Sequence, residues 1–131
     1  MIGIIVGSES DLETIKYCEE KLKDFEIDYN TIVASAHRNP NEVTSFIRQC
    51  EKQGFKIFIA GAGMAAALPG VVASQTELPV IGVPMKSDLM GIDSLLSIVQ
   101  MPKGVPVACM SVGKHGAVNA AIFAKKILDL G

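Results

Sequence analysis

The sequence predicts an α/β domain in which helices cover both faces of a parallel β-sheet. Short apolar runs alternate with longer amphipathic segments along all 131 residues. Each pair of consecutive parallel strands needs a crossover connection, usually a helix, so this alternation favours a parallel sheet. Hydrophobic residues make up 49% of the chain and charged residues only 20%, which is typical of strands buried on both faces or of surface hidden in an oligomer.

The first half of the chain predicts two strand–helix units. Residues 2–6 form an apolar strand, and the helix that follows has Ser10 as N-cap and Glu13 completing a capping box. The next strand spans residues 27–34, and the second helix begins with Asn39 as cap and Pro40 at its first position. Apolar residues at helical spacing predict the buried stripe of each helix: Leu12, Ile15, Cys18, Leu22 and Phe25 in the first, and Val43, Phe46, Ile47 and Cys50 in the second.

The second half of the chain continues this alternation. Further strands are predicted at residues 56–60, 79–83 and 105–110. A helical segment of small residues follows Gly61-Ala62-Gly63, another helix lies between the last two strands, and a final helix runs from about residue 117 to 130. No repeat or linker interrupts the pattern, so residues 1–131 are predicted to form a single domain.

Composition and charge exclude several classes of protein. The formal net charge of −2 argues against nucleic-acid binding, which needs a basic surface. The uncharged stretch at residues 57–76 is nearly long enough to span a membrane, but Pro69 and three glycines break it into strand, loop and helix. No signal peptide is expected, because the first strand has no basic region before it. The three cysteines are far apart, so we expect no metal site, no disulfide and a cytoplasmic location.

Polar and glycine-rich segments follow four of the predicted strands, at residues 7–11, 35–38, 61–63 and 84–87. Ligands of parallel α/β sheets bind outside the carboxyl ends of the strands, so these segments are expected to meet in one site. The first segment offers backbone N–H groups and two serine hydroxyls to a phosphate, although helix capping alone also explains it. Asp11 repels phosphate but accepts hydrogen bonds from ribose hydroxyls, so a ribose phosphate suits this segment.

His37 and Arg38 are the candidate reactive residues after the second strand. Imidazole both accepts and donates a proton near neutral pH, which suits His37 to general acid/base catalysis, and its alternative is a purely structural role. The Arg38 guanidinium offers a bidentate clamp for phosphate or carboxylate, and its alternative is a surface ion pair.

Other motifs are weaker. The segment 61–66 matches the dinucleotide fingerprint GxGxxG/A only formally, because it follows the third strand and no acid ends the next one. Close approach of its backbone to a ligand and packing of small residues explain it equally well. Lys86, Asp88 and Asp93 lie in or near the loop after the fourth strand, where they gate the site or are merely solvated, and His115 is expected in a loop or cap.

Several motifs occur together in the order of a known family. They are Gly-Ser-Glu-Ser-Asp at 7–11, Ser-Ala-His-Arg at 35–38, Ala-Gly-Ala-Gly at 60–63, Leu-Pro-Gly at 68–70, Gly-Val-Pro at 82–84, the run Gly-Ile-Asp-Ser-Leu-Leu-Ser-Ile-Val-Gln-Met-Pro-Lys-Gly-Val-Pro-Val-Ala at 91–108, and Asn-Ala-Ala at 119–121. The chain thus resembles the N5-carboxyaminoimidazole ribonucleotide mutase family over nearly its whole length.

The resemblance implies a flavodoxin-like, three-layer α/β/α sandwich with a five-stranded parallel sheet, usually assembled as a homo-octamer and working without a cofactor. It implies an enzyme of purine biosynthesis that moves a carboxylate from N5 to C4 of an aminoimidazole ribonucleotide by decarboxylation and recarboxylation. His37 would be the general acid/base. The residues that would bind the small ribonucleotide substrate are Ser8, Ser10 and Arg38 at the phosphate, Asp11 at the ribose, and Ser35, Ala36, Ala62, Gly63 and Leu68 around the imidazole and carboxylate.

Three features depart from the family pattern. Mutases usually have histidine where this chain has Ala67. The branch that uses CO2 directly has alanine there, but with Gly-Arg-Ser-Asn before it and lysine in place of Arg38, so Arg38 favours the mutase branch. The loop at 85–90 is about one residue shorter than usual, and the usual C-terminal helical tail does not follow Gly131.

Two alternatives therefore remain beside the mutase. One is a direct, CO2-dependent carboxylase of aminoimidazole ribonucleotide, and the other is a non-catalytic nucleotide-binding module of the same fold. A carboxylase of pyridine nucleotides, which shares a pattern resembling residues 63–69, fits the motifs at 35–38 and 91–108 less well.

Overall fold

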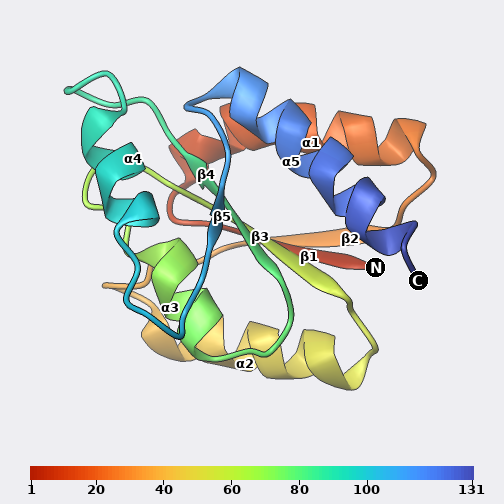
Figure 1. Ribbon diagram of the computed structural model, residues 1–131. Coiled ribbons are helices and arrows are strands. Elements are labelled where there is room, and N and C mark those ends of the chain that lie inside the picture. The colour runs from red at the N-terminus through yellow and green to blue at the C-terminus, as the bar shows by residue number, and fades with distance from the viewer.

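A computed structural model describes residues 1–131 and contains one parallel sheet with the strand order β2-β1-β3-β4-β5 (Figure 1). The strands are β1 (Ile2–Val6), β2 (Tyr29–Val33), β3 (Ile57–Ala62), β4 (Val80–Pro84) and β5 (Ala108–Cys109). The helices are the short 3-10 helix η1 (Glu9–Asp11), α1 (Leu12–Asp24), α2 (Pro40–Lys52), α3 (Leu68–Ser74), α4 (Ile92–Val99) and α5 (Lys114–Leu128). This strand order is the flavodoxin-like one, so the predicted fold class is confirmed.

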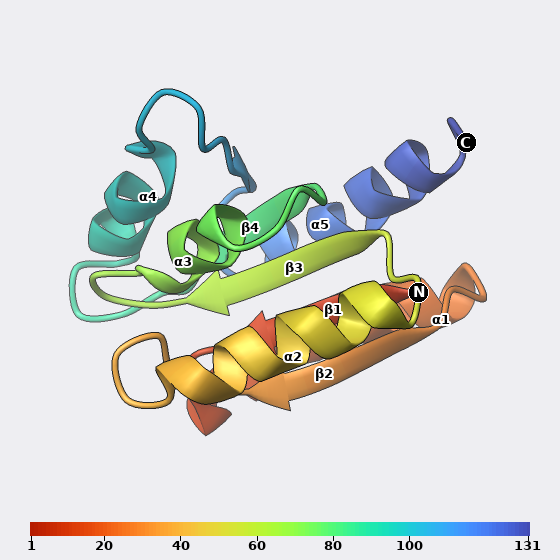
Figure 2. The same ribbon diagram turned by 90° about the horizontal axis from the view of Figure 1, so that it is seen from below.

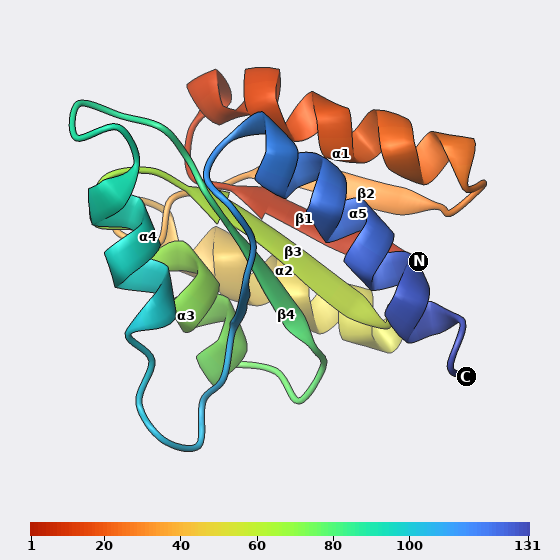
Figure 3. The ribbon, with the colours of Figure 1, turned by 45° about the horizontal axis from the view of Figure 1, so that its top comes forward.

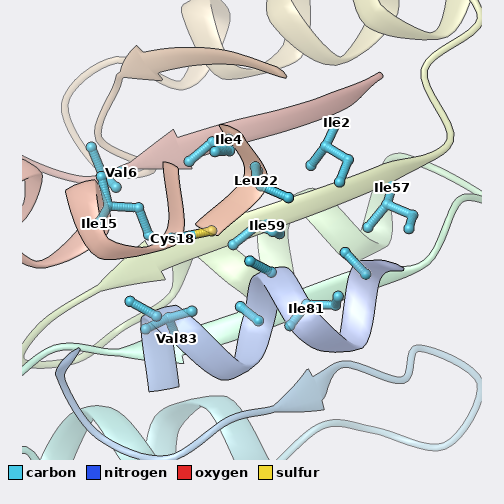
Figure 4. Packing of buried hydrophobic residues seen from close by; sticks show 14 of the residues in the cluster. Ile2, Ile4, Val6, Ile15, Cys18, Leu22, Ile57, Ile59, Ile81 and Val83 are labelled. Atoms are coloured by element: carbon cyan, nitrogen blue, oxygen red, sulfur yellow. The ribbon is translucent and has the colours of Figure 1, made fainter. Parts of the chain in front are cut away.

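Helices cover both faces of the sheet and complete the three layers (Figure 3). On one face, the side chains of β1, β3 and β4 pack against α1 and α5; Figure 4 labels ten of these residues, from the three strands and α1. On the other face, α2, α3 and Ile98 of α4 cover the sheet. Every residue of β1, β3 and β4 is buried, which explains why these strands are continuous apolar runs in the sequence.

The predicted apolar stripes form the buried faces of the helices. In α1, Ile15, Cys18 and Leu22 are buried, whereas Leu12 at the start of the helix remains 36% exposed. In α2 the whole predicted stripe is buried: Val43, Phe46, Ile47 and Cys50. Helical spacing therefore identified which side of each helix faces the sheet.

The start of each of the first two helices differs from the sequence prediction. Ser10 is not an N-cap, because it lies inside η1 and the N-cap position of α1 is taken by Asp11. The Ser10 hydroxyl instead lies 2.8 Å from the Ser8 hydroxyl. Asn39 and Pro40 do start α2, but the Asn39 side chain turns away from the helix and makes no capping hydrogen bond.

Two strands and the last helix also differ from prediction in their limits. β3 continues through Gly61 and Ala62, because the carbonyls of these residues accept hydrogen bonds from the next segments of the neighbouring strands. β5 contains two residues instead of the predicted six, and Pro106 before it has no N–H to donate to β4. α5 begins at Lys114, so His115 lies in its first turn and not in a loop.

Gly116 in the first turn of α5 is required by a close approach between two parts of the backbone. A Cβ atom at this position would overlap the carbonyl oxygen of Ser111, which belongs to the segment that leads into the helix. We expect Gly116→Ala to lower the free energy of unfolding by about 1–3 kcal/mol, despite the better helix propensity of alanine, because a backbone carbonyl cannot rotate away as a side chain does. Urea unfolding measures this change.

The matched control is Asn119→Ala, which places alanine at an exposed position of the same helix. It is expected to leave stability unchanged or slightly raised. Equal stability of the Gly116 variant and the parent protein would contradict the close approach.

Candidate active site

The carboxyl ends of four strands lie level at one edge of the sheet. The parallel register pairs Val6 of β1 with Val33 of β2 and with Gly61 of β3, and Ala62 with Pro84 of β4. Figure 2 shows β2 and β3 pointing to this same edge, where the loops lead on to α2 and α3. The chain therefore leaves each strand into a common space, as expected for the ligand-binding edge of an open α/β sheet.

A cleft of about 510 Å³ opens at this edge and is lined by the loops after β1, β2, β3 and β4. Its volume falls within the usual range of small-molecule sites. All ten residues predicted for the site line it: Ser8, Ser10, Asp11, Ser35, Ala36, His37, Arg38, Ala62, Gly63 and Leu68. Seven further residues complete the lining: Gly7, Met64, Ala65, Ala66, Ala67, Lys86 and Ser87.

The segment after β1 contributes two hydroxyls and a carboxylate. The Ser8 and Ser10 hydroxyls are 2.8 Å apart, so one of them donates a hydrogen bond to the other. Asp11 is half-buried. Burial raises the pKa of its carboxyl above the usual value, against an opposing effect of hydrogen bonds from Ser8. The Asp11 carboxyl lines the cleft, where a ligand hydroxyl can reach it, and it has lost part of its hydration.

The segment after β2 is held by its own polar groups. The Ser35 hydroxyl oxygen accepts hydrogen bonds from the backbone N–H groups of His37 and Arg38, both at 3.2 Å. The Asn39 side-chain oxygen accepts from the Ser35 N–H at 3.2 Å, and the Asn39 N–H donates to the Ser35 carbonyl at 2.8 Å. The side chains of His37 and Arg38 remain exposed in the cleft. Ser35 thus has a structural function that the sequence did not indicate, since it fixes the backbone from which both side chains extend.

The segment after β3 forms an apolar wall. Ala62 is the last strand residue, and Ala66 and Leu68 are buried beneath the cleft. Met64 has a left-handed backbone with φ of 57°, which costs a non-glycine residue about 1–2 kcal/mol. Ala67 lines the cleft next to Leu68. This wall has no side-chain hydrogen-bonding group, so it suits the face of a flat, weakly polar ring.

The segment after β4 brings Lys86 and Ser87 into the cleft. The Met85 N–H donates to the Ala62 carbonyl at 2.9 Å, which keeps this segment beside the end of β3. The Ser87 hydroxyl donates to the Asp93 carboxylate at 3.3 Å. The sequence placed Lys86 near the site, as a gating or a solvated residue, because it directly follows a predicted strand.

Other candidate features lie away from this cleft. His115 is exposed on α5 and does not line it. A second hollow of about 570 Å³ runs between the edge strand β2 and α2, and Glu42 is the only charged residue that lines it. It contains neither an imidazole nor a cation, so we assign the site to the cleft at the strand ends. Nowhere in the chain do three or more His, Cys, Asp or Glu side chains gather as a metal-binding group.

Comparisons with known proteins identify the family and the fold that this chain resembles. The model of the family described as AIR carboxylase matches residues 1–131. The N5-carboxyaminoimidazole ribonucleotide mutase of Pyrococcus abyssi is 55% identical over 130 residues, which cover 98% of this chain and 74% of that protein. The mutase of the same name from Bacillus subtilis is 53% identical, with 98% and 80% covered. The crystal structure of Treponema denticola PurE superimposes with a TM-score of 0.89 at 30% identity, covering 98% of this chain and 80% of that one.

The raised pKa of Asp11 leads to a testable change in stability. Above this pKa the buried carboxylate destabilises the folded protein, because folding removes water from a charge; below it the group is neutral and the effect disappears. We therefore expect Asp11→Asn to raise the melting temperature of the ligand-free protein at pH 7.5. The difference should shrink as the pH is lowered through the range in which the carboxyl takes up its proton.

Differential scanning fluorimetry across pH measures both effects. Glu9→Gln is the matched control, because it removes a neighbouring carboxylate that is exposed, and we expect it to change the melting temperature little. A lower melting temperature of the Asp11 variant at pH 7.5 would show that the carboxylate is stabilising and contradict the prediction.

Proposed function

The chain belongs to the AIR carboxylase family, and we propose that it is an enzyme of purine biosynthesis that converts N5-carboxyaminoimidazole ribonucleotide into 4-carboxy-5-aminoimidazole ribonucleotide. The match of the family model to residues 1–131 and the mutases at 53–55% identity support this proposal. The observation that carries it is the gathering of His37, Arg38, Asp11 and the serine pair in a single cleft at the strand ends.

The substrate lies across the strand ends in this proposal. Its phosphate binds at Ser8, Ser10 and Arg38, where two adjacent hydroxyls and a guanidinium offer donors. The Asp11 carboxylate accepts hydrogen bonds from the ribose hydroxyls. The imidazole ring lies on the apolar wall formed by Ala62, Gly63 and Leu68, with Ser35 and Ala36 beside it.

His37 moves one proton in each direction. The protonated imidazole gives its proton to N5 as the bond between N5 and the carboxylate carbon breaks, and CO2 is released into the cleft. The C4 electron pair then attacks CO2, and the neutral imidazole removes the C4 proton, which restores the aromatic ring. The proton added to N5 equals the proton taken from C4, so the enzyme returns to its initial state. Its contribution is confinement, orientation and one proton shuttle.

Ala67 favours a second candidate function, which is the direct carboxylation of aminoimidazole ribonucleotide by CO2. Ala67 lines the cleft at the position where mutases usually have histidine. Arg38, which lines the same cleft, favours the mutase. A non-catalytic module of the same fold is the remaining alternative, and it would bind nucleotide without turnover.

A paired assay tests the reaction and the role of His37 together. Isomerisation of the N5-carboxylated nucleotide is compared with bicarbonate-dependent carboxylation for the parent protein, and we expect isomerisation to dominate. His37→Asn should bind the product nucleotide nearly as well as the parent but lose turnover by roughly 10²–10⁴-fold, the usual contribution of general acid/base catalysis.

The control for this assay is His115→Asn, because His115 is exposed outside the cleft, and it should keep full activity. Equal turnover by the parent and the His37 variant would exclude His37 as the acid/base. Faster bicarbonate-dependent carboxylation would favour the direct carboxylase, and nucleotide binding without turnover in either assay would favour the non-catalytic module.

We also propose that the protein works as a homo-oligomer, an octamer as in its family. The support lies on α4, where Ile92, Leu96 and Val99 recur at helical spacing and are 59%, 49% and 51% exposed. Leu89 and Met90 in the preceding loop extend this apolar face. An exposed apolar face of this kind on a short helix is typical of an interaction surface, and a second copy of the chain would bury it.

Light scattering after size exclusion tests the oligomer. The parent should have a mass close to eight times 13.9 kDa, and Leu96→Glu should reduce it, because the interface would have to bury a charge. Gln53→Glu adds the same charge at an exposed position after α2 and should leave the mass unchanged. A parent protein that is monomeric at micromolar concentration would contradict the proposal.

A cytoplasmic location completes the proposal. The three cysteines are free, as is usual in a reducing compartment. Cys18 is fully buried, and burial raises the pKa of its thiol to about 12. Separately, none of the helices has the length and apolar character needed to cross a membrane.

A further inference from the structure

Lys86 is the one charged residue of the cleft to which the proposed reaction assigns no role. The cleft contains four residues with ionisable or charged side chains: Asp11, His37, Arg38 and Lys86. Arg38 follows β2 and Lys86 follows β4, with β1 and β3 between those strands. Three strand spacings correspond to roughly 14 Å, so the two cations enter the cleft from opposite sides.

The proposed substrate also has two anionic groups at opposite ends, a phosphate on the ribose and a carboxylate on the imidazole. Resting on the proposed function, we propose that the Lys86 ammonium binds the carboxylate, both on N5 of the substrate and on C4 of the product. Arg38 and the serine pair occupy the phosphate end, and Lys86 is the only cationic side chain on the other side of the cleft.

The backbone that carries Lys86 is fixed on both sides. The Met85 N–H donates to the Ala62 carbonyl at 2.9 Å, and the Ser94 hydroxyl donates to the Met85 carbonyl at 2.7 Å. Ser94 is fully buried, and it is the only polar or charged side chain in the core. After Lys86, the Ser87 hydroxyl is held by Asp93. The loop therefore presents Lys86 at a defined place beside the end of β3, where the imidazole ring is expected.

The side chain itself is free to bind a ligand. The two ion pairs of the protein join Lys16 to Glu13 and Lys125 to Asp129, so no acidic side chain neutralises Lys86. The nearby wall consists of apolar residues, among them Ala67 and Leu68, and provides no competing hydrogen-bonding side chain. The Lys86 ammonium is therefore available as a cationic partner for an anion that lies against this wall.

A lysine suits a carboxylate that moves. Its ammonium is a point charge with three rotatable donors on a flexible stem, so it can follow the carboxylate from N5 to C4. CO2, formed between these two states, is neutral and is not held by the charge. Lys86 therefore stabilises the bound substrate and the bound product to the same extent. Removal of its charge is expected to raise KM and the Kd of the product more than it lowers kcat.

The experiment compares two nucleotides that differ only in the carboxylate. Calorimetry gives the Kd of the 4-carboxylated product and of aminoimidazole ribonucleotide for the parent protein, Lys86→Met and Lys86→Arg. We expect Lys86→Met to weaken binding of the carboxylated nucleotide roughly five- to tenfold, as for loss of one partly solvated charged hydrogen bond. Binding of the uncarboxylated nucleotide should change less than about twofold, and Lys86→Arg should recover most of the loss.

Arg38→Ala is the matched control, since it removes the cation at the phosphate end and should weaken both nucleotides alike. An equal effect of Lys86→Met on both nucleotides, or no effect on either, would overturn the inference. These outcomes are distinct from failure of the proposed function, which would appear as a parent protein that turns over neither substrate. Lys86 is exposed, so the variants are expected to fold, and equal melting temperatures verify this.

Discussion

The parallel register of the central strands is the constraint on which the rest of the structure depends. Hydrogen-bonded pairing sets Val6, Val33 and Gly61 side by side and places Ala62 beside Pro84. A shift of a strand by one residue would turn its side chains to the opposite face, and the alternate residues of β1 and β3 that pack against α1 and α5 would then face α2 and α3. Burial of the two faces of the sheet therefore fixes the register of the strands. The register in turn fixes the position along the strand direction at which each loop leaves the sheet.

Polar groups around the cleft are divided between those that hold the loops and those that remain free. Ser35, Asn39 and Ser94 use their side chains on backbone groups, and each fixes a segment that carries another residue into the cleft. His37 and Lys86 extend from these fixed segments with exposed side chains. Rigid loops with free reactive side chains hold a bound ligand in a fixed orientation, which is a large contribution to catalysis in enzymes generally.

Some features of this protein reduce the stability of the folded chain. The partly buried Asp11 carboxylate loses hydration, Met64 has a left-handed backbone, and α4 exposes an apolar face. Two of these features lie in the cleft, and the third follows the Lys86 loop directly in the chain. Local departures from favourable structure of this kind are common at functional sites of proteins.

The sequence by itself determined the fold class and which loops line the cleft. Apolar runs and helical stripes predicted the strands and the buried helix faces, and strand ends followed by polar segments predicted that residues such as Ser8, Arg38 and Gly63 would share one cleft. Periodicity contains this information because burial selects side chains residue by residue. Tertiary structure alone decided what depends on neighbours distant in the sequence. It extended β3 through Ala62, reduced β5 to two residues, turned Asn39 toward Ser35, and brought Lys86 opposite Arg38. Hydrogen-bond partners and distances across the sheet are set only when the strands pair. A local sequence pattern therefore cannot predict them.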